Sequence, residues 1–318
     1  MKGRVAVLFD PEGAEVVLEP ETAGSGSWVG APSVLRDGED VVLTYRRRRP
    51  RGLPSDRGYS NTIAVSHAGG PFRDVAALTK EDLEAASLER SALVRDTVGG
   101  GWVWLVSFVD PADGRWRIDA FRAATLTGLP RGERTTVLTA ESTGSEGVKD
   151  PVPVRAGDRL WLLVSWAEGS GASAQAMHGT ADAYNTGLVR CGTALASSDD
   201  LRRWAWHGPC LRTGDGWDRY QARLTTVVPV GPGWMGLYDG SARVEENYEE
   251  RLGLAAATDL AAWRTLTPQG PAVVSNGTTG SVRYADVLPD TAGLWVYFEC
   301  SRPDGAHDLR RTLLRWKA

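Results

Sequence analysis

A short pattern of polar and apolar positions recurs five times along the chain. In each copy a residue pair, usually polar or charged, precedes a β-prone run, and a turn then leads to a more apolar strand about ten residues later. Successive copies are 59, 60, 73 and 61 residues apart. Repeats of this length are typical of arrays of small β-sheets. The second member of the pair is Ala31, Arg90, Asp150, Arg223 and Tyr284 in turn.

Each repeat has room for four strands. Second strands are expected at 41–45, 102–108, 160–166, 234–238 and 294–298, third strands at 61–66, 115–121, 193–198, 253–258 and 307–315, and fourth strands near 75, 137, 206 and 265. Five such antiparallel meanders predict an all-β, five-bladed β-propeller that forms a single domain over 1–318. Its inner strands would start near residues 30, 89, 149, 222 and 283.

The fifth repeat ends after three strands. Residues 5–8 at the N-terminus are expected to supply its fourth strand, which would close the ring and cover an open edge. Two unrelated sandwich domains are the alternative architecture. The regular spacing over the whole chain argues against them.

The predicted topology brings the polar pairs to one mouth. In an antiparallel meander the start of the first strand lies on the same face as the connection between the second and third strands. Those connections, at 46–58, 109–114, 167–190, 239–251 and 299–306, are where function is usually placed. The residues that they and their borders add are Tyr45, Arg46, His178, Asp239, Glu245, Glu246, Glu249, Glu250, Glu299, Asp304, His307 and Asp308. The alternative is that the charges pair with one another along a water channel, because buried charges need partners.

Composition limits the classes of molecule that the protein is expected to bind and the location expected for it. The formal net charge is −4 without a basic tail, which gives no indication of nucleic-acid binding. No apolar run is long enough to cross a membrane, and the first ten residues lack a signal pattern, so a cytoplasmic location is expected. Three widely spaced cysteines form neither a disulfide framework nor a zinc motif. We expect a monomer without a cofactor, and no ligand spacing indicates a metal.

Two motifs carry a family resemblance. Lys149-Asp150-Pro151 opens an inner strand, and Asp-Leu-x-x-Trp turns occur at 200–204 and 259–263. Together with the repeats they resemble the five-bladed propellers of the arabinanase, β-xylosidase and invertase/levansucrase glycoside hydrolases and their mannoside-phosphorylase relatives. The resemblance covers nearly the whole chain. The segments 238–240, 245–251 and 302–309 resemble a bacterial branch of that group.

The resemblance implies that Asp150 orients substrate or supports the transition state. It also reveals two departures, because Ala31 stands where the family has an aspartate and Arg223 where it has a glutamate. Glycoside cleavage generally needs two carboxyl groups. Our catalytic candidates are therefore Asp150 and Glu89, faced by Asp239 or by Glu246 from the acidic run 245–250, which is alternatively a solvated loop.

The arginines suggest an anionic substrate, such as a uronic acid or a sugar phosphate, because guanidinium groups bind carboxylate and phosphate through paired hydrogen bonds. A neutral sugar that stacks on Trp28 or Trp217 is the alternative. The substrate-binding candidates are Arg90, Lys149, Arg223, Arg283, Tyr284, Trp28 and His307.

Three functions follow from this pattern. The first is a glycoside hydrolase-like enzyme with carboxylates as acid and base. The second is a biosynthetic cyclase, lyase or transferase on the same scaffold, which the alanine at position 31 favours. The third is a sugar-binding propeller without activity. Fold alone does not choose among them.

Overall fold

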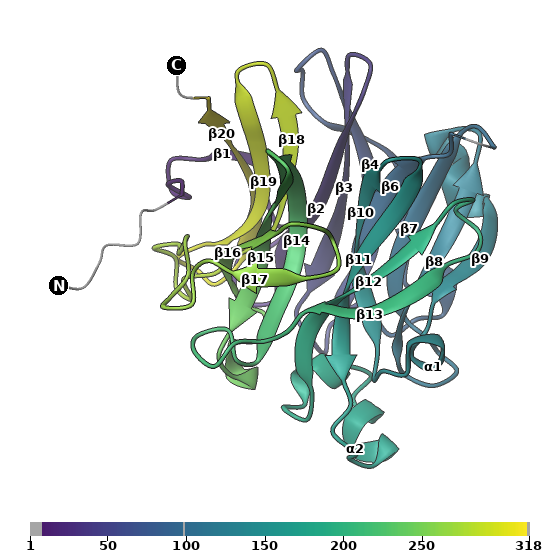
Figure 1. Cartoon of the computed structure of the whole chain (residues 1–318), viewed down its shortest axis with the longest axis vertical. Helices are drawn as coiled ribbons and strands as arrows, with labels where there is room; N and C mark the ends of the chain where they lie inside the picture. The colour runs from purple at the N-terminus through teal and green to yellow at the C-terminus, as the bar shows by residue number, and fades with distance from the viewer. Residues whose placement is uncertain (1–7, 98, 317–318) are drawn as a thin grey trace.

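The computed structural model describes residues 8–97 and 99–316, and the regular secondary structure of this part of the chain is almost entirely β-strand. The all-β class is thereby confirmed. The strands are hydrogen-bonded into sheets of eight, four and eight strands (Figure 1). Each eight-stranded sheet consists of two antiparallel meanders joined by a single parallel pair, Trp28 with His307 in one and Cys191 with Gln221 in the other.

The first sheet contains β1 (Glu15–Leu18), β2 (Trp28–Asp37), β3 (Asp40–Arg49), β4 (Arg57–His67), β5 (Arg73–Thr79), β18 (Val282–Asp290), β19 (Gly293–Ser301) and β20 (His307–Arg315). The four-stranded sheet contains β6 (Leu88–Arg95), β7 (Trp102–Val109), β8 (Trp116–Ala123) and β9 (Glu133–Leu138). The last sheet contains β10 (Val148–Ala156), β11 (Arg159–Glu168), β12 (Arg190–Ser198), β13 (Ala205–Leu211), β14 (Gln221–Val230), β15 (Gly233–Ser241), β16 (Arg251–Ala257) and β17 (Trp263–Thr265).

Helical segments are short and lie in the connections. They are α1 (Ala140–Thr143), α2 (Ala174–His178) and 3-10 turns at Glu81–Leu83, Leu126–Arg131, Ala183–Asn185 and Val244–Glu246. In the part of the chain with described coordinates, none of these helices is long and apolar enough to cross a bilayer.

The N-terminal segment joins the sheet later than expected. Of the predicted strand at 5–8, residues 5–7 lie outside the described residues, and Leu8 belongs to no strand. Besides β19, β20 pairs antiparallel with β1, about ten residues beyond the predicted strand, through pairs such as Glu15 with Arg311.

The core lies between neighbouring meanders. Successive side chains of a strand point to opposite faces, and β7 shows this clearly. Trp104 and Phe108 pack toward Ile63 of the preceding meander, whereas Val103 and Leu105 pack toward Leu162 of the next one. Both faces of the central strands are therefore apolar, which explains why β7 has an almost continuous hydrophobic sequence.

A β-bulge interrupts the first strand of every meander at or beside the recurring residue pair. The pairing register shifts between Gly30 and Ser33, Leu88 and Ser91, Lys149 and Val152, Leu224 and Thr226, and Arg283 and Asp286. Ala31, Asp150 and Tyr284 adopt positive φ values of 51°, 57° and 52° there. A left-handed conformation costs a non-glycine residue about 1–2 kcal/mol. Bulges re-aim side chains next to functional sites, so the repeat marks the place where the strands turn their side chains to the centre.

Candidate active site

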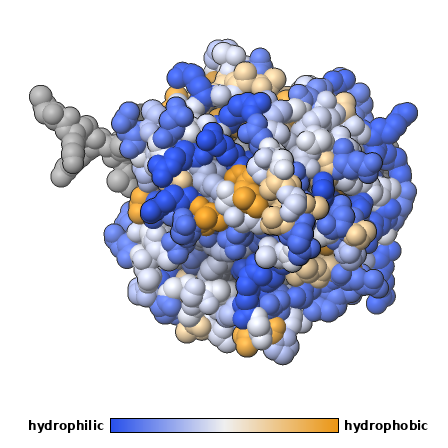
Figure 2. All heavy atoms as spheres, turned by 90° about the horizontal axis from the view of Figure 1, so that it is seen from below, coloured by the Kyte–Doolittle hydropathy of each residue, from blue (hydrophilic) through white to orange (hydrophobic). Residues whose placement is uncertain are grey.

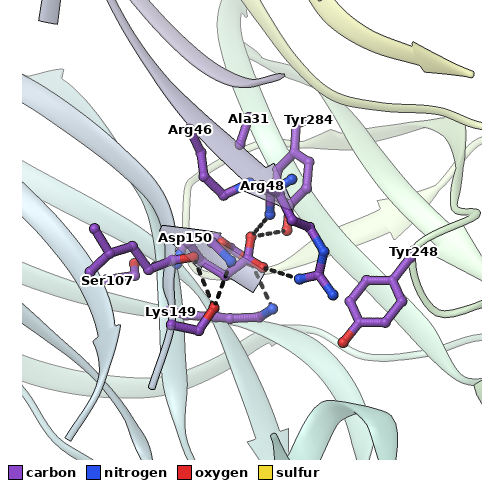
Figure 3. A network of polar contacts seen from close by, with 12 residues as sticks. Ala31, Arg46, Arg48, Ser107, Lys149, Asp150, Tyr248 and Tyr284 are labelled. Atoms are coloured by element: carbon purple, nitrogen blue, oxygen red, sulfur yellow. Dashed lines mark hydrogen bonds and ion pairs between the residues drawn. The ribbon is translucent and has the colours of Figure 1, made fainter. Parts of the chain in front are cut away.

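A set of ionisable side chains meets at the centre of the molecule, next to the bulges. Each of its members is at most 3% exposed to solvent. Figure 3 shows several of them pointing toward one another between the strands. We call this set the central charge cluster, and it consists of Arg46, Glu89, Lys149, Asp150, Arg223, Asp239, Glu250, Arg283, Tyr284, Glu299 and His307.

Glu299, on β19, is the most heavily paired carboxylate of the central charge cluster. One oxygen lies 2.6 Å from Arg283 Nη2 and 2.8 Å from His307 Nδ1, and the other lies 3.2 Å from Arg46 Nη2. The backbone N–H of Ala31 donates to the same second oxygen at 3.1 Å. Burial alone would raise the pKa of Glu299, but Arg283 and Arg46 hold it well below its usual range.

Arg223 joins three carboxyl groups. Its guanidinium lies 2.6 Å from Glu250, 3.4 Å from Asp150 and 3.5 Å from Asp239. Arg283 approaches the other oxygen of Glu250 at 2.8 Å. Arg223 thus organises carboxyl groups that come from β10, from β15 and from the connection that precedes β16.

Asp239, on β15, accepts hydrogen bonds from the backbone N–H of Tyr284 at 3.0 and 3.2 Å. Complete burial raises its pKa, and repulsion from Glu250 adds to this, while Arg223 opposes it. The net effect raises the pKa of Asp239 to about 8, so this carboxyl group carries a proton at neutral pH.

Glu89, on β6, has the opposite electrostatic environment. It forms a close ion pair with Arg46, accepts a hydrogen bond from the Tyr284 hydroxyl at 3.1 Å and lies 4.0 Å from Arg48 Nη1. Burial would raise its pKa, but Arg46, Lys149 and Arg48 lower the pKa of Glu89 to about 2. Glu89 is therefore ionised at neutral pH.

Asp150 sits on the bulge of β10 with one oxygen engaged and one free. Ser165 Oγ donates to Oδ2 at 2.9 Å, and Lys149 Nζ lies 3.9 Å from the same oxygen. The Asp150 N–H donates to Ser107 Oγ at 2.8 Å, which anchors the bulge. Oδ1 is buried and has no hydrogen-bond partner among residues 8–97 and 99–316. Such an orphaned acceptor is available to a substrate hydroxyl.

Arg90 does not join the central charge cluster. Its Nη1 donates to the Thr225 carbonyl at 2.5 Å, and its Nη2 lies 3.4 Å from Asp286. Arg90 and Asp286 line a separate cavity of about 170 Å³, which the later parts of the first strands surround. Glu246 also lies apart, because it accepts from the Ala242 N–H at 2.7 Å and remains partly exposed.

The two tryptophans expected to stack against sugar are engaged with protein groups. Trp28 stacks on His307 at 4.6 Å between ring centroids and is 7% exposed, with Arg283 above the same ring. Trp217 stacks on Tyr238 and donates to the Thr267 carbonyl at 2.7 Å. Neither ring is an open platform in this structure.

Three cluster residues, Arg46, Asp239 and Glu299, come from second strands. Each pairs across the sheet with the recurring residue pair, as Gly30 with Arg46, Arg223 with Asp239 and Arg283 with Glu299. The sequence pattern puts Arg46 and Glu299 in the predicted mouth but assigns them no role. Arg46 and Glu299 each follow their pairing partner on the first strand, Gly30 and Arg283, by 16 residues. That constant spacing is the signal in the sequence that could have identified them as site residues.

Connections between the second and third strands cover this end of the molecule, which Figure 2 views from below. Asp182 holds them together, because it accepts from the Tyr248 hydroxyl at 2.5 Å and from Trp116 Nε1 at 3.3 Å. Arg57 and Arg51 lie 3.7 and 3.6 Å from the same residue. Within the described ranges, no group of three histidine, cysteine or acidic side chains is arranged to hold a metal ion.

Asp239 links stability to pH. Its pKa is about 8 in the folded protein against 3.8 ordinarily, so the folded chain keeps a proton that the unfolded chain releases between these values. The folded state therefore loses stability as the pH rises from about 4 to about 8. Urea titrations should show the unfolding free energy of wild type, relative to that of Asp239→Asn, falling across this window. A difference that does not change with pH would contradict the raised pKa.

No protein-family model and no curated protein matches the chain. Solved structures with the same fold exist at low sequence identity. A thermostable family-43 glycoside hydrolase is 12% identical, with a TM-score of 0.66 over 95% of this chain and 93% of its own.

Two further structures give the same result. The GH43_1 enzyme from Xanthomonas citri complexed with xylotriose is 14% identical, with a TM-score of 0.65 over 96% of this chain and 91% of its own. A member of the GH130 family of mannoside phosphorylases and glycoside hydrolases is 15% identical, with a TM-score of 0.59 over 97% of this chain and 95% of its own. The chain therefore has a fold like that of the β-propeller glycoside hydrolases.

Proposed function

We propose that the protein is a glycoside hydrolase-like enzyme that acts at the central charge cluster. The five meanders are the five blades of one propeller over 1–318, and β1 completes the last blade. The substrate is a sugar or glycoside. The reaction uses Asp239 as the acid and Glu89 as the ionised partner.

The observation that carries the proposal is a pair of buried carboxyl groups with opposite protonation states. The pKa of Asp239 is raised to about 8 and that of Glu89 is lowered to about 2. Tyr284 contacts both, through its backbone N–H and its hydroxyl respectively. Groups whose environments separate their pKa values in this way are suited to divide acid and base roles.

The chemistry follows from these states. Protonated Asp239 would donate its proton to the leaving glycosidic oxygen, and Glu89 would act as base or nucleophile on the sugar. Asp150, with its free Oδ1, would accept a hydrogen bond from a sugar hydroxyl. Because cluster members are at most 3% exposed, substrate reaches them only when the connections held by Asp182 move.

The solved structures support the substrate class. Some of those with the same fold were determined with xylotriose or xylose bound. Because their sequence identity to this chain is low, experiment has to identify the sugar and the glycosidic bond.

We also propose that the protein is a monomer and that it is located in the cytoplasm.

The test is a screen of chromogenic aryl glycosides, both neutral and acidic, with product analysis by chromatography. Release of the aryl group should depend on protonated Asp239, so kcat should decline as the pH rises through about 8. The absence of hydrolysis across the screen would contradict the proposal.

A biosynthetic cyclase, lyase or transferase is the second candidate, and one observation favours it. The Ala31 position has no carboxylate of its own, and its N–H is occupied by Glu299. Conversion of a glycoside without uptake of water would identify this second class of reaction.

A further inference from the structure

Two buried cations of this site lack hydrogen-bond acceptors. Arg48 is 6% exposed and Lys149 is 3% exposed. Each approaches one carboxylate at the limit of an ion pair, Arg48 Nη1 to Glu89 at 4.0 Å and Lys149 Nζ to Asp150 at 3.9 Å. Across the described residues neither guanidinium nor ammonium has a hydrogen bond to protein, and Arg48 Nε is fully buried without a partner. Buried charges left in this state are costly unless a ligand satisfies them.

Aromatic rings hold both cations in place. The Arg48 guanidinium lies between Trp28 and Tyr248, 4.8 and 4.5 Å from the ring centroids. Lys149 Nζ lies 4.9 Å from the Trp116 ring and 4.5 Å from the Tyr184 ring. Ring faces attract cations but accept no conventional hydrogen bond from all their N–H groups. The cations are thus oriented while several donors stay available, and Figure 3 shows Arg48 beside Tyr248 with Lys149 below.

The count of positive and negative charges in the site also indicates room for a bound anion. Arg46, Arg223 and Arg283 each have a carboxylate at hydrogen-bond distance, as Glu89, Glu250 and Glu299 respectively. Arg48 shares the Glu89 carboxylate with Arg46, which pairs closely with Oε2 while Arg48 Nη1 stays 4.0 Å from Oε1. With Asp239 protonated, the cations of the cluster together with Arg48 outnumber its ionised carboxylates.

We propose that Arg48 and Lys149 together bind an anionic group of the substrate, which makes the substrate an acidic sugar. This inference rests on the proposed function of the site. A carboxylate such as that of a hexuronic acid suits the planar fork of Arg48, which offers parallel N–H donors, and Lys149 adds a point charge. A sugar phosphate presents the same chemistry. This pair keeps Lys149 from the set expected from the sequence and puts Arg48 in place of Arg90, Arg223 and Arg283.

The test is calorimetric binding of D-glucuronate, glucose 6-phosphate, inorganic phosphate and glucose to the full chain. We expect an anionic sugar to bind at least about tenfold more tightly than glucose. Arg48→Gln and Lys149→Met should each remove that preference. Preference for glucuronate identifies a carboxylate as the natural group, and preference for glucose 6-phosphate identifies a phosphate.

Arg49→Gln is the matched control, because Arg49 is the next residue on β3, is partly exposed and pairs with Glu21 at the surface. It should bind the anionic sugar as wild type does. Arg48→Lys keeps the positive charge but lacks the planar fork. It therefore tests the contribution of the Arg48 guanidinium to the anion preference if Arg48→Gln does not fold. Equal binding of glucose and all anions, or an unchanged preference in Arg48→Gln, would overturn the proposal.

Binding by Asp239→Asn separates this inference from the proposed function. That variant keeps Arg48 and Lys149, so it should still prefer the anionic sugar although it lacks the acid. If wild type prefers the anionic sugar but hydrolyses no glycoside, the proposed function fails and the anion site stands. If it hydrolyses glycosides without any preference for acidic ones, the anion site fails alone.

Discussion

Asp239→Asn should reduce kcat/KM on any glycoside that the protein hydrolyses by about 10²–10⁴-fold, the usual contribution of a positioned general acid. Asparagine keeps an oxygen that can accept from the Tyr284 N–H, so the fold should survive while the proton donor is lost. Initial rates on an aryl glycoside, measured alongside a thermal melt, check the expectation.

The leaving group sharpens this test. A glycoside with a strongly acidic aryl leaving group needs little protonation, so the loss in Asp239→Asn should be smaller for it than for a poor leaving group. Glu89→Gln should lose activity on both kinds of substrate. Asp199→Asn is the control, because Asp199 is an exposed carboxylate paired with Arg159 far from the cluster. Equal losses of Asp239→Asn on both leaving groups would remove Asp239 from the acid role.

Glu299→Ala should lower the free energy of unfolding by about 3–5 kcal/mol, the range for breaking a buried ion pair by removing one partner. The substitution leaves Arg283, Arg46 and His307 in the interior without their common acceptor. Urea denaturation at neutral pH measures the change.

A surface ion pair provides the comparison. Glu15 forms two hydrogen bonds with Arg311 and is more than half exposed, so Glu15→Ala should change the unfolding free energy by about 0–1 kcal/mol. If Glu299→Ala and Glu15→Ala had the same small effect, the cluster would not be the electrostatic core that its geometry indicates. The loss of unfolding free energy in Glu299→Gln should lie between those of Glu299→Ala and Glu15→Ala, because an amide oxygen can still accept a hydrogen bond from Arg283.

The contrast between these two residues explains why an ion-paired centre and a working site are compatible. Glu299 and Glu250 neutralise Arg283 and Arg223, and this pairing positions the groups around Asp239 and Glu89. The alternative raised from the sequence, mutual pairing of the charges, therefore accounts for part of the cluster. That pairing leaves three groups available to a ligand, which are Arg48, Lys149 and the free oxygen of Asp150.

The sequence by itself determined the all-β class and the position of the first strand in each repeat. The reason is local, since alternating and apolar runs bounded by turn residues specify strands regardless of their neighbours. It also indicated that Asp150, Lys149, Arg223, Arg283 and Tyr284 would meet, because every repeat brings the same strand end to the same face.

Only the tertiary structure decided the roles of individual charges. Arg90 and Glu89 are adjacent in sequence, but the bulge in β6 turns one toward Asp286 and the other toward Arg46. The opposite pKa shifts of Asp239 and Glu89 arise from burial and from the number of arginines around each group, which no local pattern encodes. Register, bulge geometry and charge balance are properties of packed strands, so the acid, its partner and the unpaired cations emerged only when the repeats were brought together.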